Sequence, residues 1–391
     1  MNRNLPSEIS KKKMIIMKKI HTFEIDPLDV TFEPLAGSTL TNLLHLLVQN
    51  RFNVSIMGMP RIMYSLLLTS VQSPLNVLEK RYFNKHIKDQ EIKKHPIFIL
   101  GHWRSGTTYL HNLFSQDKRY AYPTTLQTVI PALFVKYGEL FRPLVEDSLP
   151  ETRPEDNVAL GADLPQEEEY ALGNLSPYSF YNGWCFPKKM NFYNNYVDFY
   201  HVPPETIEDF KRIYMNYLKK VSFYHNHKRL ILKNPSNTAR IKLLLEMFPN
   251  AKFVFIYRNP YHVYLSMKRN IEKEMTLYTV QNPPTWEIFE KEMVTMYNRM
   301  FFKYFKEKNL IPADNLYEVK YEDFVSRPLD HMKNIYASLK LEHFDDNKEI
   351  FKKYIVSQSH ITSSKYLIDS KQQQHIYRLF KETIDRWNYT I

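Results

Sequence analysis

Residues 96–108 read PIFILGHWRSGTT. The first five form a short apolar run, which is typical of a buried strand in a parallel sheet. A loop that contains Gly101 and Gly106 follows. Apolar residues then recur at helical spacing, at Leu110, Leu113 and Phe114. The segment therefore predicts a strand, a glycine-containing loop and a helix in direct succession.

The loop has the spacing of a phosphate-binding loop, with four residues between its two glycines and two hydroxyl residues after them. Backbone N–H groups of such a loop, with the N-terminus of a helix behind them, bind anions. A loop that holds a nucleoside triphosphate carries a lysine directly after the second glycine. This chain has Thr107 there and places its positive charge inside the loop, at Arg104. No predicted strand of the block ends in an aspartate that would hold a metal, so we expect an anion site without one.

Three further strands are predicted downstream, at residues 230–232, 253–257 and 316–320. A helical pattern precedes the first of them, over residues 205–224, and another follows it, over residues 241–248. Strands that alternate with helices indicate βαβ units and a parallel sheet. We therefore predict an α/β fold of P-loop-like type, with three layers (α/β/α) around a central parallel sheet.

The strand at 253–257 is followed directly by Arg258, and Pro260 suits the first turn of a helix. Ligands bind at the carboxyl ends of strands in such sheets, so Arg258 is well placed for an anion. Ser266 lies about two helical turns beyond it. An arginine after a strand is more often a surface charge. Arg258 indicates an anion site only in combination with the loop at 101–108.

The predicted organisation is an irregular N-terminal lead-in, residues 1–34, and one domain, residues 35–391. Within that domain we expect a helical cap at 35–90 and a nucleotide-binding core at 96–330. Residues 120–205 are rich in proline, tyrosine, asparagine and acidic residues and show weak periodicity. We interpret them as an irregular insertion, a usual place for loops that contact a substrate.

Residues 38–83 predict two or three helices with apolar faces. We favour a cap that packs on the core. The alternative is a pair of helices on a membrane surface, because cationic residues flank the apolar faces. These residues are Arg51, Arg61, Lys80 and Arg81.

Composition limits the classes of protein further. The net charge of +11 suits an anionic partner. Cys185 stands alone, so we expect no disulfide, no cysteine-based zinc site and a reducing, cytoplasmic location. The apolar run at residues 14–17 is too short for a signal peptide. Residues 62–78 are too polar and too interrupted for a membrane span.

Together these motifs resemble the sulfotransferases that depend on 3′-phosphoadenosine 5′-phosphosulfate (PAPS), and a bacterial-type branch in particular. Further similarity lies at residues 153–158, 165–169 and 232–235. In that family the first loop grips the 5′-phosphosulfate, and an arginine with a serine eight residues on grips the 3′-phosphate. The first motif is matched at Arg104, Ser105, Gly106, Thr107 and Thr108. The second is matched at Arg258 and Ser266.

This chain departs from the cytosolic members of the family in two ways. They carry a lysine where it has Arg104, and they end in an Arg-Lys-Gly motif that it lacks. Lys365 is a weak substitute for that motif.

The resemblance implies transfer of a sulfuryl group from PAPS to a hydroxyl or amine acceptor, with a glutamate as general base. The acidic run at 167–169 is the candidate; we favour Glu167, with Glu168 second. His102, inside the loop, competes with them, or it packs beside Trp103. We expect Arg104 and Lys233 to stabilise the departing phosphate. For any single glutamate of the run, a solvated helix face is the more ordinary interpretation.

Two other classes stay open at this point. A P-loop small-molecule kinase shares the strand, loop and helix, but it would need a loop lysine and magnesium ligands. A non-catalytic protein that binds membranes or nucleic acid would gather its cations on one face, whereas they are spread along this chain, so we expect no nucleic-acid partner. We expect a small-molecule, lipid or glycan acceptor; the oligomeric state stays open.

Overall fold

The computed structural model describes residues 30, 33–153, 158–358, 366 and 368–390. Its centre is one sheet of five parallel strands in the order β2-β3-β1-β4-β5. The strands are β1 (Ile97–Leu100), β2 (Tyr120–Ala121), β3 (Arg229–Lys233), β4 (Lys252–Tyr257) and β5 (Leu316–Lys320). The predicted α/β fold with a parallel sheet is confirmed, as are its four longer strands. The edge strand β2 has two residues, too few to produce a pattern in the sequence.

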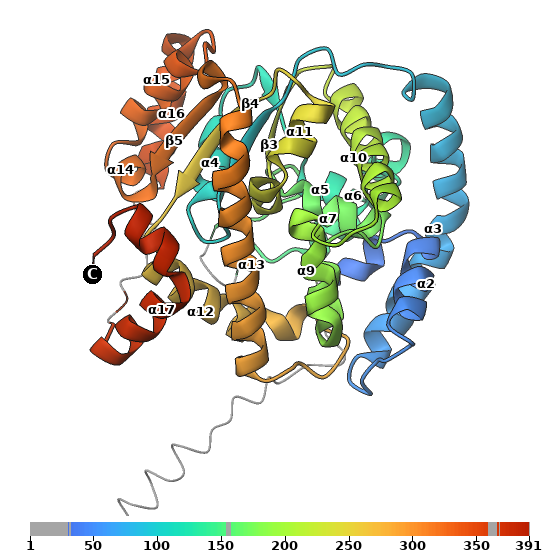
Figure 1. The fold of residues 1–391 in the computed structure, drawn as a ribbon. Coiled ribbons are helices and arrows are strands. Elements are labelled where there is room, and N and C mark those ends of the chain that lie inside the picture. Colours follow the sequence, from blue (N-terminus) through green and yellow to red (C-terminus); the bar gives the residue numbers. More distant parts are fainter. Residues whose placement is uncertain (1–29, 31–32, 154–157, 359–365, 367, 391) are drawn as a thin grey trace, which may run out of the picture.

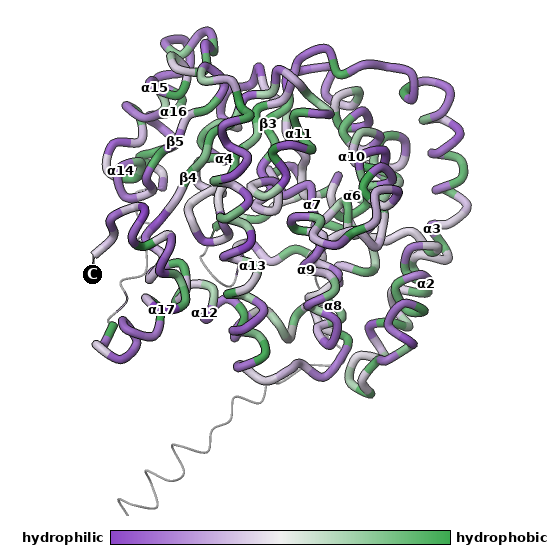
Figure 2. The backbone as a smooth tube through the Cα atoms, viewed as in Figure 1, coloured by the Kyte–Doolittle hydropathy of each residue, from purple (hydrophilic) through white to green (hydrophobic). Residues whose placement is uncertain are grey.

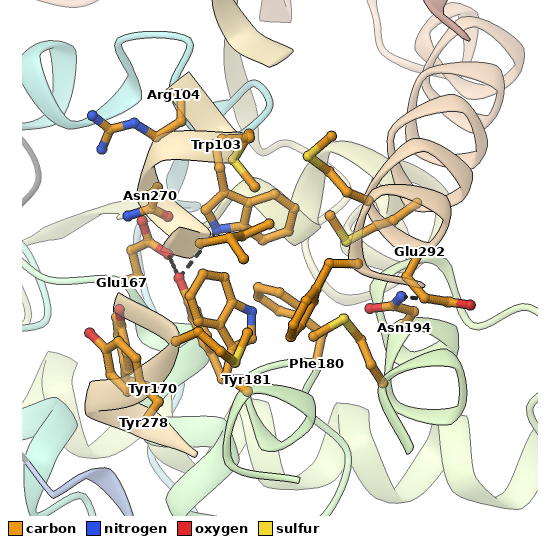
Figure 3. A pocket seen from close by; sticks show the side chains of 18 of the residues that line it. Trp103, Arg104, Glu167, Tyr170, Phe180, Tyr181, Asn194, Asn270, Tyr278 and Glu292 are labelled. Atoms are coloured by element: carbon orange, nitrogen blue, oxygen red, sulfur yellow. Dashed lines mark hydrogen bonds between the residues drawn. The ribbon is translucent and has the colours of Figure 1, made fainter. Parts of the chain in front are cut away.

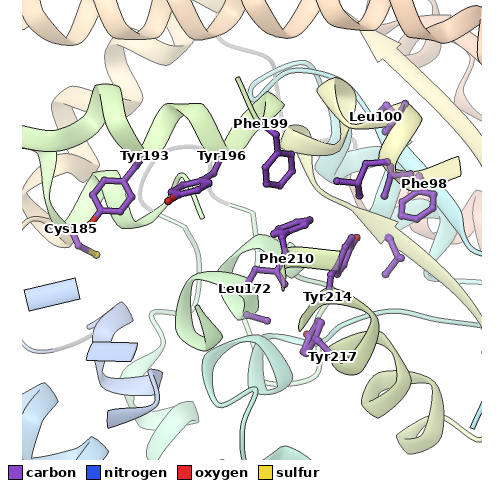
Figure 4. Close-up of a cluster of buried hydrophobic side chains, with 14 of the residues drawn as sticks. Phe98, Leu100, Leu172, Cys185, Tyr193, Tyr196, Phe199, Phe210, Tyr214 and Tyr217 are labelled. Carbon is purple, nitrogen blue, oxygen red and sulfur yellow. The ribbon is translucent and has the colours of Figure 1, made fainter. Parts of the chain in front are cut away.

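Helices cover both faces of the sheet (Figure 1). Because successive strand residues point to opposite faces, Ile97 and Ile99 belong to one buried cluster and Phe98 and Leu100 to the other. The first cluster packs on α4 (Thr107–Phe114), α14 (Tyr321–Ser326), α15 (Pro328–Ser338) and α16 (Phe344–Ser357). The second packs on α10 (Pro204–Tyr224), α11 (Ile241–Met247), α13 (Trp286–Glu307) and further helices. Hydrophobic residues run through the strands (Figure 2), and Figure 4 shows aromatic side chains of the second cluster.

Residues 120–205 hold more regular structure than the sequence pattern indicates. They contain β2, α5 (Thr125–Val129), α6 (Phe134–Ser148), α7 (Glu168–Leu175), α8 (Asn182–Cys185), η2 (Pro187–Lys189) and α9 (Met190–Asp198). Most of these helices have three turns or fewer, so each is too short for its hydrophobic periodicity to be recognised in the sequence. Local signals fix them instead: Thr124 and Gln127 form a reciprocal capping box at the start of α5.

The N-terminal helices expected at 38–83 are present as α2 (Leu40–Gln49) and α3 (Met59–His86), preceded by η1 (Pro34–Gly37). Arg61, expected among the flanking surface cations, is instead buried. Its Nε lies 2.6 Å from Glu33 Oε2, and its Nη1 donates to the carbonyl of Thr279 at 3.0 Å. A buried arginine is tolerated because these partners replace its hydration. The ion pair therefore ties α3 to the residue before η1, and the hydrogen bond to Thr279 ties α3 to the end of α12 (Pro260–Tyr278).

The remaining short helices and the C-terminal helix complete the chain. They are η3 (Pro235–Ala239), η4 (Lys308–Leu310), η5 (Ala313–Asn315) and α17 (Ser370–Arg386). In the part of the chain that the structure describes, no helix combines the length and the apolar character needed to cross a bilayer. Most of the lead-in at 1–34 and Lys365 lie outside the described residues. The cytoplasmic location stays a prediction.

Candidate active site

The loop after β1 is held in a shape that its two glycines permit. Gly101 has φ = +145° and Gly106 has φ = +92°, a region that side chains rarely adopt. A Cβ at Gly101 would lie 2.4 Å from the carbonyl oxygen of Ile256, and one at Gly106 would lie 2.3 Å from the Tyr321 ring. The loop thus packs tightly against β4 and the end of β5. The N-terminus of α4, which begins at Thr107, follows it directly.

The two predicted phosphate motifs are joined by hydrogen bonds. Arg104 Nε donates to Ser266 Oγ at 2.9 Å, and Arg258 Nη1 donates to the carbonyl of Arg104 at 3.0 Å. The guanidinium of Arg258 also lies 4.4 Å from the centre of the Tyr321 ring. Its buried Nε has no hydrogen-bond partner among the described residues. The structure therefore brings together the loop, the end of β4 and the first turns of α12.

A cavity opens beside this junction (Figure 3). We call it the active-site cavity. Its polar end is lined by Arg104, Thr107, Thr108, Arg153, Glu167, Tyr181 and Asn270. Its other end is lined mainly by apolar side chains: Phe180, Trp184, Met190, Met267, Ile271, Met275, Phe289, Met293 and Met296.

Glu167 is the member of the acidic run that faces the active-site cavity. Glu167 is the N-cap residue of α7. Its backbone is extended, so its side chain does not follow the helical arrangement of the residues after it. Glu167 Oε1 accepts a hydrogen bond from Lys233 Nζ at 2.5 Å, and Oε2 accepts one from the Tyr181 hydroxyl at 2.6 Å. Two partners from different elements thus fix the carboxylate. Glu167 is buried except for its access to the cavity.

The other two glutamates are buried and point elsewhere, so the run is not a solvated helix face. Glu168 Oε1 accepts hydrogen bonds from the Tyr214 hydroxyl at 2.7 Å and from Asn237 Nδ2 at 2.9 Å. Glu169 forms an ion pair with the fully buried Arg240 at 2.8 Å. Each carboxylate therefore has its own partners, and neither lines the active-site cavity.

Glu168 nevertheless has a strongly perturbed carboxyl group. Burial raises its pKa to about 7, although the hydrogen bond from Tyr214 acts in the opposite direction. Repulsion by Glu169 and Glu167 makes a smaller contribution to the rise. A pKa near neutrality suits a general base, but a base must also reach the substrate. The position of Glu168 does not meet that second requirement.

Lys233 and His102 also lie behind the wall of the active-site cavity rather than in it. Lys233 is buried and paired with Glu167, and burial lowers its pKa. His102 Nδ1 lies 2.8 Å from the carbonyl oxygen of Trp103, and its ring packs edge-on against Tyr297. Burial lowers the pKa of His102 to about 4. The contacts of His102 are those of a packing residue.

Several cavity residues were missed by sequence reasoning. Trp103 Nε1 donates to the Tyr181 hydroxyl at 3.2 Å, and the Tyr181 ring stacks on Tyr170 with 4.2 Å between centres. Nothing in a tyrosine-rich segment marks these two tyrosines. Asn270 could have been found, because it lies one helical turn after Ser266 on the same face. Arg153 begins one of the segments that resemble the family.

No three histidine, cysteine, aspartate or glutamate side chains gather as a metal site would require, within the described ranges.

Comparison with known proteins identifies the family. A model of the "Sulfotransferase family" matches residues 96–346. The omega-hydroxy-beta-dihydromenaquinone-9 sulfotransferase Stf3 of Mycobacterium bovis is 31% identical over 355 residues, which cover 90% of each chain. The protein of that name from Mycobacterium tuberculosis matches equally. Among solved structures, sulfotransferase STF9 from Mycobacterium avium superposes with a TM-score of 0.67 at 15% identity, covering 100% of this chain and 99% of that one. Sulfotransferase STF1 from M. tuberculosis gives 0.57 at 15% identity, with 97% and 99% covered.

The raised pKa of Glu168 predicts a pH-dependent stability. Its folded-state pKa of about 7 lies above the ordinary 4.5, so the stabilisation is complete below the lower value and is lost as pH rises through the higher one. Glu168→Gln stays neutral and can still accept both hydrogen bonds. Between about pH 5 and pH 8 its free energy of unfolding should gain ~1–3 kcal/mol relative to the unsubstituted protein. Urea denaturation measures this.

The matched control is Glu151→Gln, which changes an exposed glutamate. Its unfolding free energy should follow that of the unsubstituted protein at every pH. Parallel curves for Glu168→Gln and the unsubstituted protein would show that Glu168 ionises normally.

Proposed function

Because the chain belongs to the sulfotransferase family, we propose that it transfers a sulfuryl group from PAPS to a hydroxyl or amine of its acceptor. The hydrogen-bonded junction of Arg104 with Ser266 and Arg258 carries this proposal. The loop amides and the start of α4 suit a 5′-phosphosulfate. Arg258 and Ser266 are close enough to serve the 3′-phosphate of the same nucleotide.

We assign the general base to Glu167. The acceptor oxygen or nitrogen gives its proton to the carboxylate and forms a bond to sulfur. The bond between sulfur and the bridging oxygen of the phosphosulfate breaks, and adenosine 3′,5′-bisphosphate leaves. Lys233 and Tyr181 hold the carboxylate, so it does not have to reorient during the reaction. We therefore assign Lys233 a positioning role.

The charge that grows on the departing phosphate needs fixed positive groups. Arg104 lines the active-site cavity from the loop after β1, and Arg153 lines it from the insertion at residues 120–205. Thr107 and Thr108 add hydroxyl and backbone donors at the start of α4. We propose that these residues stabilise the leaving group in place of the metal ion that phosphoryl transfer uses.

The apolar end of the active-site cavity supports an acceptor with an apolar body. Methionine side chains from α9, α12 and α13 dominate that end (Figure 3). Methionine adapts to irregular apolar ligands. The name of the Stf3 relative describes a hydroxylated menaquinone derivative as its substrate. We propose that the acceptor here is also a hydroxyl-bearing apolar compound.

Arg258→Ala should weaken binding of adenosine 3′,5′-bisphosphate by about 10- to 100-fold, because it removes charged hydrogen bonds to the 3′-phosphate. Isothermal titration calorimetry measures the change. Arg212→Ala removes an exposed arginine on α10 and should leave binding unchanged. ATP with magnesium should not compete; competition that Arg258→Ala does not alter would favour the kinase alternative.

Glu167→Gln should lower turnover ~10²–10⁴-fold, the usual worth of a general base, while the affinity for adenosine 3′,5′-bisphosphate is retained. Transfer of labelled sulfate from PAPS measures turnover. Among the described residues, Glu292 is the other carboxylate that lines the active-site cavity; it accepts a hydrogen bond from Asn194 Nδ2 at 3.1 Å near the apolar end. Glu292→Gln should cost much less. The assignment of the base fails if Glu167→Gln turns over normally.

We also propose that the outer face of α3 contacts a membrane surface. Met59, Met63, Leu67 and Val71 form a stripe at helical spacing, between 50% and 64% exposed. Residues 40–88 contain one acidic residue, Glu79, which is buried and paired with Lys220 at 2.8 Å.

The exposed cations on the same helices and their connecting loop are Arg51, Lys80, Arg81 and Lys85. An apolar stripe with cations and without exposed carboxylates suits an anionic bilayer.

Replacing Met63, Leu67 and Val71 by glutamate should lower binding to mixed phosphatidylcholine–phosphatidylglycerol vesicles by at least about tenfold, because apolar burial is lost and repulsion gained. Co-sedimentation measures this. The control triple variant replaces Phe302, Leu310 and Ile350, which are exposed on other parts of the surface, by glutamate. It should bind the vesicles as the unsubstituted protein does. Equal loss in both variants, or a dimer in solution that only the first variant dissociates, would contradict membrane contact through α3.

A further inference from the structure

A second cavity shares Tyr170 of α7 with the lining of the active-site cavity. It is enclosed by η1, α3, α5, α6 and the start of α7. The apolar side chains that line it are Val30, Pro34, Ala36, Leu68, Val129, Ile130, Phe141, Leu144, Val145 and Leu149.

Most polar groups of the second cavity are already engaged. Gln72 Nε2 donates to the carbonyl of Ala36 at 3.5 Å, and Asn174 Nδ2 donates to that of Thr128 at 3.3 Å. Glu33 is paired with Arg61. The space that remains is therefore suited to an apolar ligand rather than an ion or a sugar.

The second cavity and the active-site cavity share a wall. Tyr170 lines both of them, and Gln166, which directly precedes Glu167, lines the second. The Tyr170 ring stacks on Tyr181, whose hydroxyl donates to Glu167 at 2.6 Å. Tyr170 thus links the lining of the second cavity to the contacts that hold the proposed base.

The second cavity also lies directly beneath the apolar stripe of α3. Tyr64, Leu68 and Gln72 line it from the inner side of that helix. The residue before each of them, Met63, Leu67 and Val71, belongs to the exposed stripe. Leu144 of α6 lines the cavity and is itself 45% exposed, so the cavity reaches the surface at its side chain.

We propose that the second cavity binds the apolar chain of the acceptor, an alkyl or isoprenoid chain that ends in a hydroxyl group. This inference rests on the proposed sulfuryl transfer and specifies where the apolar chain of the acceptor binds. The chain enters from the lipid side near Leu144, lies along the second cavity and passes Tyr170. Its terminal hydroxyl then reaches Glu167. The chemical step is unchanged.

Straight-chain primary alcohols of increasing length provide the test, with labelled PAPS as donor. Each buried methylene should raise kcat/KM about fourfold until the second cavity is filled. We therefore expect a steep rise from butanol through octanol to dodecanol. Equilibrium dialysis with tritium-labelled dodecanol measures binding without turnover and should show one saturable site.

Leu68→Trp fills the second cavity from α3, and Val77→Trp introduces the same side chain at a position of α3 that is 51% exposed and does not line the cavity. Leu68→Trp should weaken dodecanol binding and lower kcat/KM for dodecanol by at least about tenfold. Its kcat/KM for butanol and its affinity for adenosine 3′,5′-bisphosphate should change by less than about twofold. Val77→Trp should match the unsubstituted protein throughout.

Dodecanol binding that Leu68→Trp leaves intact would overturn the inference. So would binding that is lost while transfer to dodecanol persists, because the second cavity would then hold a ligand other than the acceptor. In both cases intact transfer to butanol would leave the proposed sulfotransferase function standing. A failure of adenosine 3′,5′-bisphosphate to bind any of these proteins would instead contradict that function.

Discussion

The hydrogen bonds among Arg104, Ser266 and Arg258 are the constraint on which the rest of the site depends. They exist because β1 and β4 are neighbouring parallel strands, so the loop after one and the helix after the other begin at the same edge of the sheet. Tyr321, the residue directly after β5, packs against Gly106 and against the Arg258 guanidinium. Two motifs far apart in the sequence thereby meet at one surface, the one that we propose binds the nucleotide.

The acidic run of α7 connects that surface to the helical layer. Three consecutive carboxylates are buried together at a cost that only specific partners can offset. Each has a different set: Lys233 and Tyr181 for the first, Tyr214 and Asn237 for the second, Arg240 and Asn234 for the third. Because four of these partners follow or end β3, the run locks α7 to the sheet. The first carboxylate alone remains turned toward the active-site cavity.

The strands were predictable, and the two proposed phosphate motifs could be located, because each is a local pattern. The active-site cavity was not, because its lining comes from elements scattered between Trp103 and Met296. The sequence analysis favoured Glu167 over Glu168, but the sequence does not show which of them caps α7, and the cap is the residue that faces the active-site cavity. The sequence analysis also misplaced Arg61, whose partner Glu33 lies in the segment interpreted as an irregular lead-in.

The account's central claim is that one nucleotide spans the loop after β1 and the turn after β4. A crystal structure with adenosine 3′,5′-bisphosphate tests it most directly. We expect the 5′-phosphate at the backbone amides of residues 104–107 and the 3′-phosphate within hydrogen-bonding distance of Arg258. A nucleotide bound elsewhere, or one whose 3′-phosphate points away from Arg258 into solvent, would contradict the account.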